Sequence, residues 1–91
     1  MAIKTITFEP GAWDDFSYWV AQDIKTIKRI IELIKDIKRD PFSGIGKPEP
    51  LKYAAQAGYW SRRIDKTHRL VYRVNDETIN IIACRHHYDK R

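Results

Sequence analysis

A proline on each side of Glu49 constrains the backbone more tightly there than elsewhere in this sequence. Proline fixes its own φ and has no N–H, and a residue that precedes proline is pushed from helical toward extended geometry. The Glu49 carboxylate therefore leaves the chain in a nearly predetermined direction. Such a direction suits a general base, because a small misplacement costs a large factor in rate. The alternative is a rigid loop that carries an ordinary surface charge.

Length and composition predict one globular domain. A chain of 91 residues has the length of a single domain, and 43% hydrophobic with 32% charged residues is typical of soluble proteins. No apolar run reaches the roughly 20 residues that cross a bilayer, and the amino terminus lacks the apolar stretch of a secretory signal. Cys84 is the only cysteine, so no internal disulfide can form. We therefore expect a single domain over residues 1–91 in a reducing cytoplasm.

The positive charge is confined to the second half of the chain. Residues 1–46 carry seven basic and seven acidic side chains, whereas residues 47–91 carry ten basic and five acidic ones. All three histidines also lie in the second half. This asymmetry indicates a polyanionic partner such as nucleic acid, with a basic domain that has no such ligand as the alternative.

The first half of the chain carries the signals of one strand and two helices. Residues 3–8 are rich in β-branched and aromatic side chains, which favours a strand. Pro10 suits the first turn of a helix, and Asp23 is a candidate N-cap for a second helix that ends at Asp40 and Pro41. The apolar positions of the first helix, spaced three and four apart, are Trp13, Phe16, Val20 and Ile24. The apolar stripe of the second helix consists of Ile27, Ile30, Ile31, Ile34 and Ile37.

The second half reads as a loop followed by strands. A strand is expected to begin at residues 51–53, and three further strands are predicted at 59–64, 68–74 and 78–87. The element order is therefore β-α-α-β-β-β. Strands grouped after helices predict an α+β fold in which two amino-terminal helices pack on one face of an antiparallel sheet.

Side-chain alternation predicts which basic residues share a face of the sheet. Leu70, Tyr72 and Val74 are expected in the core, which leaves Arg69 on the opposite face. A three-residue hairpin loop at 65–67 would place Arg63 directly opposite Arg69. Like charges so placed destabilise a sheet, and an anion between them would relieve the repulsion. Guanidinium groups match phosphate geometry, so we expect phosphate binding here; the alternative is that both are solvated or paired with Asp or Glu.

The carboxyl-terminal histidines can supply an acid. For His87 to share a face with Arg69, the loop at 75–77 must hold an odd number of residues, or a bulge must intervene. Cys84, His86 and His87 do not make a structural zinc site, because such sites usually have four ligands and a second cysteine is absent. Magnesium would need clustered carboxylates, and those of the second half are scattered. We therefore expect no metal and no other cofactor.

These residues form a set that can cleave RNA without a metal. The reaction needs a base for the 2′-hydroxyl proton, cations for the charged phosphorane and an acid for the departing 5′-oxygen. Glu49, the pair Arg63 and Arg69, and His87 would supply these groups in that order. Aromatic side chains that could stack a base are Tyr53, Trp60 and Tyr88, although Trp60 is more typical of a core residue.

Four segments closely resemble the YoeB/Txe family of bacterial toxins, which belongs to the RelE superfamily. They are PFSGIGKPEPL at 41–51, GYWSRRI at 58–64, HRLVY at 68–72 and CRHHY at 84–88. The earlier segments WDD at 13–15 and YW at 18–19 also match, so the resemblance covers residues 3–88. It implies a RelE-like fold, related to the microbial ribonucleases.

The resemblance also implies a function and partners. Family members are toxins of type II toxin–antitoxin pairs, and they act as ribosome-dependent endonucleases that cut mRNA in the ribosomal A site of bacteria and so stop translation. The implied partners are mRNA, the 70S ribosome with its 16S ribosomal RNA, a YefM-like antitoxin and a second copy of the chain. The expected product is a 2′,3′-cyclic phosphate that can open to a 3′-phosphate.

Roles carry over residue by residue. By resemblance, Glu49 is the general base, Arg69 stabilises the transition state, His87 is the general acid and Tyr88 shapes the site. The basic residues expected to meet phosphate or ribosomal RNA are Lys47, Lys52 and Arg63. This chain departs from the family at His86, where tyrosine is common, and in the added residues 89–91.

Two other functions fit a basic domain of this kind. One is a non-catalytic RNA- or DNA-binding module, and the other is a degenerate toxin that only binds its antitoxin. A pure binder has no use for a doubly constrained glutamate that works with a histidine. Because every candidate catalytic position is present, the sequence favours the nuclease.

Overall fold

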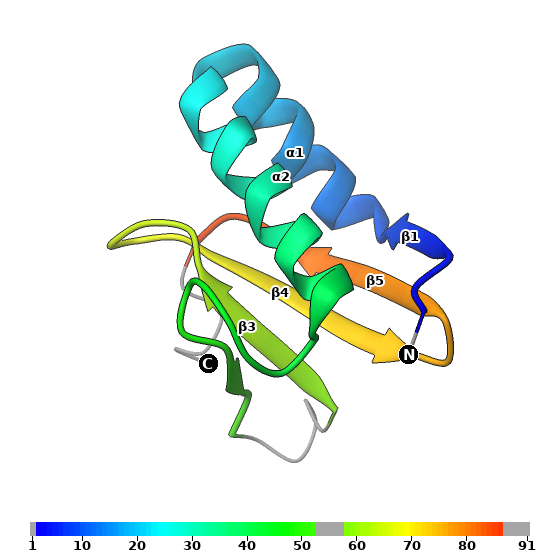
Figure 1. The fold of residues 1–91 in the computed structure, drawn as a ribbon. Helices are drawn as coiled ribbons and strands as arrows, with labels where there is room; N and C mark the ends of the chain where they lie inside the picture. Colours follow the sequence, from blue (N-terminus) through cyan, green and yellow to red (C-terminus); the bar gives the residue numbers. More distant parts are fainter. Residues whose placement is uncertain (1, 53–57, 87–91) are drawn as a thin grey trace.

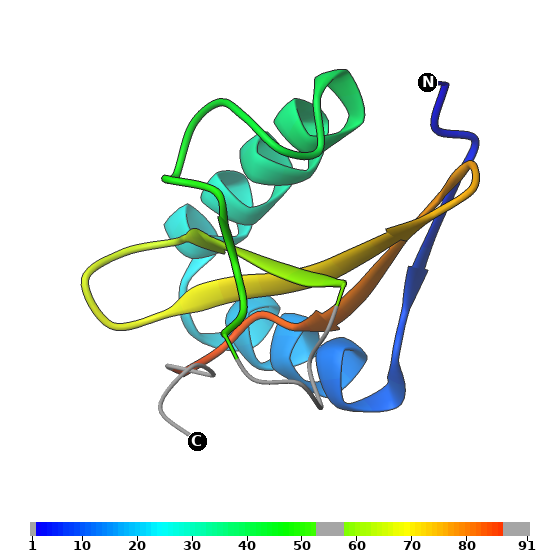
Figure 2. The ribbon, with the colours of Figure 1, turned by 90° about the horizontal axis from the view of Figure 1, so that it is seen from below.

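In the computed structural model, which describes residues 2–52 and 58–86, two helices lie over one face of a five-stranded sheet (Figure 1). Figure 2 views the molecule from below, with the strands in front of both helices. The elements are β1 (Thr5–Phe8), α1 (Pro10–Gln22), α2 (Ile24–Arg39), β2 (Glu49–Pro50), β3 (Tyr59–Arg63), β4 (Arg69–Asn75) and β5 (Thr78–Ala83). Within the described part of the chain, no helix combines the length and apolarity of a membrane span.

The α+β fold with both helices on one face is confirmed, but the sheet is mixed rather than wholly antiparallel. Its strand order is β1-β5-β4-β3-β2, and all neighbours are antiparallel except β1, which pairs in parallel with β5. Three reversals after the helices bring β5 back beside β1 in the same direction. The strand expected from residue 51 begins earlier, because Glu49 and Pro50 pair with Ser61 and Trp60. Pro50 can occupy this edge strand because an edge position tolerates a missing N–H.

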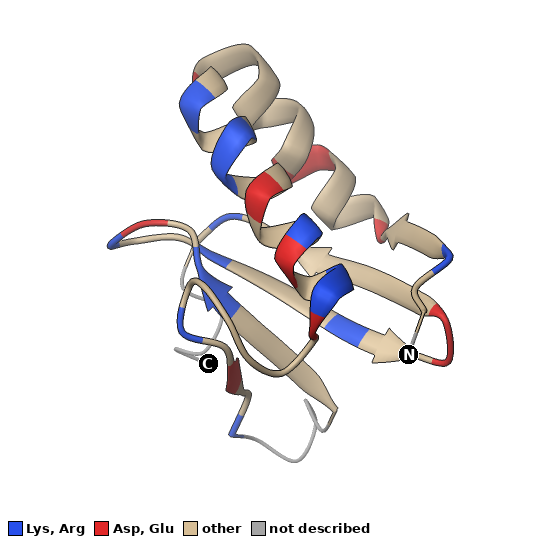
Figure 3. Cartoon of the chain, viewed as in Figure 1, with Lys and Arg blue, Asp and Glu red and all other residues tan. Residues whose placement is uncertain are grey.

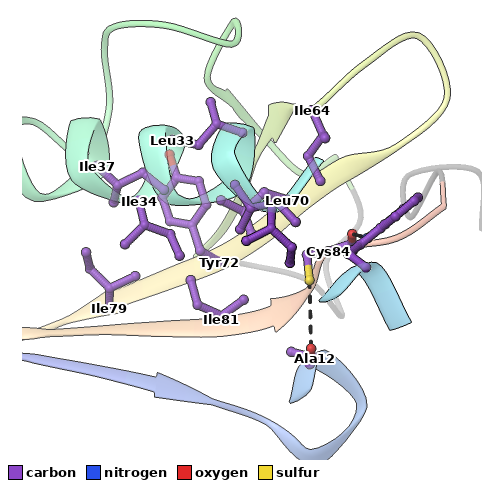
Figure 4. Close-up of a cluster of buried hydrophobic side chains, with 13 residues drawn as sticks. Ala12, Leu33, Ile34, Ile37, Ile64, Leu70, Tyr72, Ile79, Ile81 and Cys84 are labelled. Carbon is purple, nitrogen blue, oxygen red and sulfur yellow. Dashed lines mark hydrogen bonds between the residues drawn. The ribbon is translucent and has the colours of Figure 1, made fainter. Parts of the chain in front are cut away.

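The second helix has the predicted limits and nearly the predicted core face. Asp23 caps it by accepting a hydrogen bond from the backbone N–H of Lys25, and it ends at Arg39. The stripe differs at two positions, since Leu33 is fully buried whereas Ile31 is 42% exposed. Figure 4 shows Leu33, Ile34 and Ile37 facing side chains of the sheet. The residues buried from this helix are Thr26, Ile27, Ile30, Leu33, Ile34 and Ile37.

The first helix begins at Pro10 as predicted, but the prediction of its buried face was only partly right. Phe16 packs against the core as predicted, whereas Ile24 is the first residue of α2. Ala12 and Trp19 are the buried residues of α1, whereas Trp13 and Val20 are more than half exposed. A hydrogen bond from Trp19 Nε1 to the Cys84 carbonyl oxygen (2.8 Å) fixes the rotation of the helix. Spacing alone could not select this face, because apolar side chains surround much of α1.

One buried guanidinium organises the loop between α2 and β2. The Arg62 side chain is fully buried, and its Nε donates to Tyr72 Oη while Nη1 donates to the Asp36 carboxylate. The remaining N–H groups donate to backbone carbonyls of Asp40, Ser43 and Ile45. All five donors of the guanidinium are therefore satisfied.

Two glycines let the loop pass close to this guanidinium and to α2. Gly44 has φ +131°, and a Cβ there would overlap the Asp36 carboxylate. Gly46 has φ +78°, and a Cβ there would lie 2.8 Å from Leu33 Cδ2. The Gly46 carbonyl oxygen also accepts from the backbone N–H of Arg63 (2.6 Å), which ties the loop to β3 just before Glu49.

Replacing Arg62 should unfold the protein far more readily than replacing its neighbour. We expect Arg62→Met to lower the free energy of unfolding by about 3–5 kcal/mol, because Asp36 and three carbonyls lose a buried partner. Arg63→Met, on the exposed face of the same strand, should change it by no more than about 0.5 kcal/mol. Urea titrations of the two variants give the comparison, and equal stabilities would contradict the role of Arg62.

The free energy of unfolding should also depend on pH, because the Asp36 carboxylate titrates. Hydrogen bonds from Arg39 and then Arg62 lower the pKa of Asp36 far below its ordinary value. A carboxylate whose pKa is lower in the folded state stabilises the protein above its unfolded-state pKa and loses this contribution as the pH falls. Between pH 5 and pH 2.5, the free energy of unfolding should therefore fall more steeply in wild type than in Asp36→Asn. Parallel curves from urea titrations would refute this coupling.

Candidate active site

Two of the predicted catalytic side chains meet on the helix-free face of the sheet. Arg69 Nη2 donates to Glu49 Oε1 at 3.1 Å, although the residues belong to β4 and β2, with β3 between them. The side chain of Arg69 is 6% exposed and that of Glu49 is 59% exposed. The cation is therefore held in the protein, while the carboxylate remains open to an incoming molecule.

Ser61, on β3, holds the Arg69 side chain in place. Its Oγ accepts a hydrogen bond from Arg69 Nε at 2.9 Å, and Ser61 is itself 1% exposed. The register of β3 places Ser61 opposite both Glu49 and Val71. Alternation could put Ser61 on this face from the sequence, but not reveal that it is the second partner of Arg69.

The predicted pairing of Arg63 with Arg69 is confirmed by the strand register. The anion that faces Arg69 within the chain is the Glu49 carboxylate, while Arg63 is exposed. For Arg69, the repulsion expected between the two guanidinium groups is therefore relieved by a carboxylate of the protein itself. Arg62 and Arg69 are both buried, so the basic surface is smaller than the composition suggests.

Exposed basic residues lie on the segments next to Glu49. Lys47 lies two residues before Glu49, with a left-handed backbone (φ 52°), and Lys52 follows β2. Arg63 ends β3, the strand that pairs with β2. Figure 3 shows basic positions on the loop before β2, after β2, and on β3 and β4. The predicted RNA-binding residues Lys47, Lys52 and Arg63 are thus all exposed on segments that adjoin Glu49.

A bulge near the end of β5 changes which of its side chains point to the helix-free face. The β4–β5 turn holds two residues, Asp76 and Glu77, and the pairing shifts between Val71 and Tyr72. Val71 therefore pairs with Ala83 and Tyr72 with Ile81. Of the two conditions predicted for the His87 face, the bulge is the one that occurs. β5 ends at Ala83 rather than at residue 87.

Several predicted residues lie outside the described part of the chain. They are His87 and Tyr88, expected to serve in the reaction, and Tyr53, expected to stack a base. Trp60 is described and pairs with Tyr72, on the opposite face of the sheet from Glu49. Its ring meets Phe42 with centroids 4.8 Å apart, and it packs against the core as the alternative prediction held.

The described residues offer little to a metal ion or a thiol mechanism. In segments 2–52 and 58–86, no three His, Cys, Asp or Glu side chains lie close enough together to hold a metal ion. Cys84 is fully buried, and burial raises the pKa of its thiol to about 12. A thiol in this state is a poor nucleophile.

A polar hollow of about 460 Å³ continues the same face toward β1. Arg73 lies four residues along β4 from Arg69, and Asn80 pairs with it on β5. Asn80 is held by hydrogen bonds with Thr7 (2.7 Å) and Glu9 (3.0 Å). The helix-free face thus presents hydrogen-bonding groups well beyond the Glu49–Arg69 contact.

Comparison with known proteins identifies close relatives. A family described as "YoeB-like toxin of bacterial type II toxin-antitoxin system" matches residues 8–88. Toxin YoeB of Mycobacterium bovis is 55% identical over 86 residues, which cover 94% of this chain and 100% of that protein.

Solved structures agree with this similarity. The YoeB dimer of Staphylococcus aureus superposes with a TM-score of 0.89 at 49% identity, covering 96% of this chain and 100% of that one. A heterotetrameric YoeB–YefM toxin–antitoxin complex from the same organism contains a chain that superposes with a TM-score of 0.84 at 47% identity, covering 97% and 100% of the two chains.

Proposed function

Because the chain belongs to the family of YoeB-like toxins of bacterial type II toxin–antitoxin systems, we propose that it is an endoribonuclease that cuts mRNA in the ribosomal A site. The observation that carries this proposal is the contact of Glu49 with Arg69. A half-exposed carboxylate and an anchored guanidinium stand side by side on a polar face, which is where a base and a phosphate-stabilising cation are needed. Residues 1–91 act as one toxin domain in the bacterial cytoplasm.

The proposed reaction is an attack of the mRNA on its own backbone. Glu49 accepts the proton of a 2′-hydroxyl, and the 2′-oxygen bonds to the adjacent phosphorus. Arg69 stabilises the charge on the phosphorane oxygens, and its binding to Ser61 means that little reorganisation is needed. The bond from phosphorus to the 5′-oxygen then breaks, and His87 donates a proton to that oxygen. The products are a 2′,3′-cyclic phosphate and a 5′-hydroxyl, and Tyr88 helps to shape the site.

The approach of phosphate explains why Glu49 must be open. In the free protein, the Glu49 carboxylate neutralises the charge of Arg69. An incoming phosphate would replace the carboxylate as the hydrogen-bond acceptor of Arg69 Nη2, and the carboxylate would then be free to bind the 2′-hydroxyl. Lys47, Lys52 and Arg63 are exposed on segments that adjoin Glu49, and they would hold flanking phosphates of mRNA or 16S ribosomal RNA. Binding should therefore weaken as salt rises.

The partners follow from relatives. The Staphylococcus aureus YoeB forms a dimer and a heterotetramer with YefM. We propose that this chain likewise pairs with a second copy and is held inactive by a YefM-like antitoxin.

The central test removes the base and the acid separately. Glu49→Gln and His87→Gln should each lower the rate of mRNA cutting on purified ribosomes by about 10²–10⁴-fold, the usual contribution of general acid–base catalysis. Mapping of mRNA 5′ ends by primer extension measures the cuts and their position relative to the ribosome.

A matched control separates catalysis from the loss of a surface ion pair. Glu77 is 56% exposed and pairs with Lys4, much as Glu49 is 59% exposed and pairs with Arg69. Glu77→Gln should cut like wild type, and Glu49→Gln should lose no more than about 1 kcal/mol of stability, because exposed ion pairs contribute little. Both catalytic variants should keep antitoxin binding. Undiminished cutting by both variants would reject Glu49 and His87 as the base and the acid, whereas no cutting by wild type would support the non-catalytic alternatives.

The reaction should need no metal held by the toxin. Toxin stripped with EDTA and returned to ribosomes in magnesium buffer should cut as fast as untreated toxin, because protonation and guanidinium contacts supply the catalysis. Metal analysis of the active protein should find no stoichiometric transition metal. Loss of cutting that zinc or manganese restores would contradict the mechanism.

A further inference from the structure

The segment after β5, residues 84–86, is held by hydrogen bonds from elements distant in sequence. From α1, Asp15 Oδ2 accepts from the Cys84 N–H (3.0 Å), and Trp19 Nε1 donates to the Cys84 carbonyl oxygen (2.8 Å). At the start of β4, His68 Nδ1 accepts from the His86 N–H (2.8 Å), and the Arg69 N–H donates to the His86 carbonyl oxygen (3.1 Å). We call these four hydrogen bonds the terminal clamp.

The His68 ring is held in place for its part in the clamp. Its backbone N–H donates to Asp65 Oδ1 (2.7 Å), and its ring meets the buried Trp19 edge-to-face, with centroids 4.8 Å apart. A ring nitrogen that accepts a hydrogen bond carries no proton, so this geometry requires a neutral imidazole protonated on Nε2. His68 therefore does not serve as a surface cation in this arrangement.

The clamp imposes an unusual backbone on His86. This residue has φ +70°, in the left-handed region that side chains other than glycine rarely adopt. Such a conformation persists only where its surroundings impose it. Here the N–H and the carbonyl of His86 are both bound, to His68 and to Arg69, so the direction of the chain at this residue is determined from outside.

We propose that His68 is a positioning residue for the nuclease reaction, acting through the hydrogen bond that its neutral Nδ1 accepts from His86. The inference rests on the proposed function, because His87 and Tyr88 follow His86 directly and are assigned there to the reaction. The clamp joins His86, the residue before the proposed acid, to Arg69 through a backbone hydrogen bond, and Arg69 is the proposed phosphate-binding cation. A shift of about 1 Å at a catalytic group can cost 10²-fold in rate, which makes such a tether consequential.

Two substitutions separate the hydrogen bond from the packing of the ring. In His68→Asn, Oδ1 is bonded to Cγ as Nδ1 is in histidine, so an acceptor remains but the contact with Trp19 is lost. In His68→Phe, the ring remains against Trp19 but the acceptor is lost. We expect the Asn variant to cut ribosome-bound mRNA nearly as fast as wild type. The Phe variant should lose about 10–100-fold in kcat with KM little changed.

Spectroscopy tests the clamp without relying on activity. In the free protein, long-range proton–nitrogen spectra should show His68 as the Nε2–H tautomer. Exchange of the His86 amide proton should be slow in wild type and in His68→Asn, and at least tenfold faster in His68→Phe, as expected when local opening is favoured. These measurements on wild type remain informative even if one variant does not fold, and antitoxin binding checks folding of the variants.

The outcomes distinguish this inference from the function beneath it. A Phe variant as active as wild type would overturn the positioning role and indicate that ring packing is sufficient. An Asn variant as damaged as the Phe variant would also overturn it, because the retained acceptor would then not preserve the rate. An unprotected His86 amide, or a His68 proton on Nδ1, would overturn the hydrogen bond itself. If wild type cuts no mRNA, the proposed function fails and the positioning role falls with it, while the amide exchange still decides whether the clamp exists.

Discussion

The burial of Arg62 is the constraint on which the rest of the structure depends. A buried charge is tolerated only when its hydrogen bonds are satisfied, and here the five N–H groups find a carboxylate, a hydroxyl and three carbonyls. These partners belong to α2, to the loop after it and to β4, so one side chain on β3 connects both layers of the fold. The loop that leads to Glu49 takes its shape around this guanidinium, and the two close glycines permit that approach.

A second arginine, Arg69, is treated differently and gives the site its character. Its guanidinium is buried like that of Arg62, yet it faces the helix-free side, where Ser61 and Glu49 are its side-chain partners. Glu49 is mostly exposed, and in the proposed mechanism a phosphate replaces its carboxylate on one side of this cation. Arg62 is enclosed by structural partners, whereas Arg69, although also buried, contacts an exposed carboxylate.

Local chemistry explains which parts of the fold could be predicted. Pro10, Asp23 and the pair Asp40 and Pro41 restrict their own backbones or cap adjacent helix ends, so both helices have the expected limits. The short connection at 65–67 likewise determined that Arg63 faces Arg69. The direction of β1 and the buried face of α1 were missed, because each arises from contacts between segments far apart in the chain. The bulge in β5 was left open, because the length of the short turn before it does not decide the register further along the strands.

By itself, the sequence determined the rigid setting of Glu49, the face shared by Arg63 and Arg69, and the family motifs, because dihedral restriction and alternation act between close neighbours. Only the tertiary structure decided that Arg62 is internal while Arg63 is exposed, and that Glu49 is the carboxylate beside Arg69. Arg62 and Arg63 are neighbours in the sequence, and their side chains have the same chemistry and charge. They become different only when packing removes one of them from water and obliges its donors to find partners within the protein.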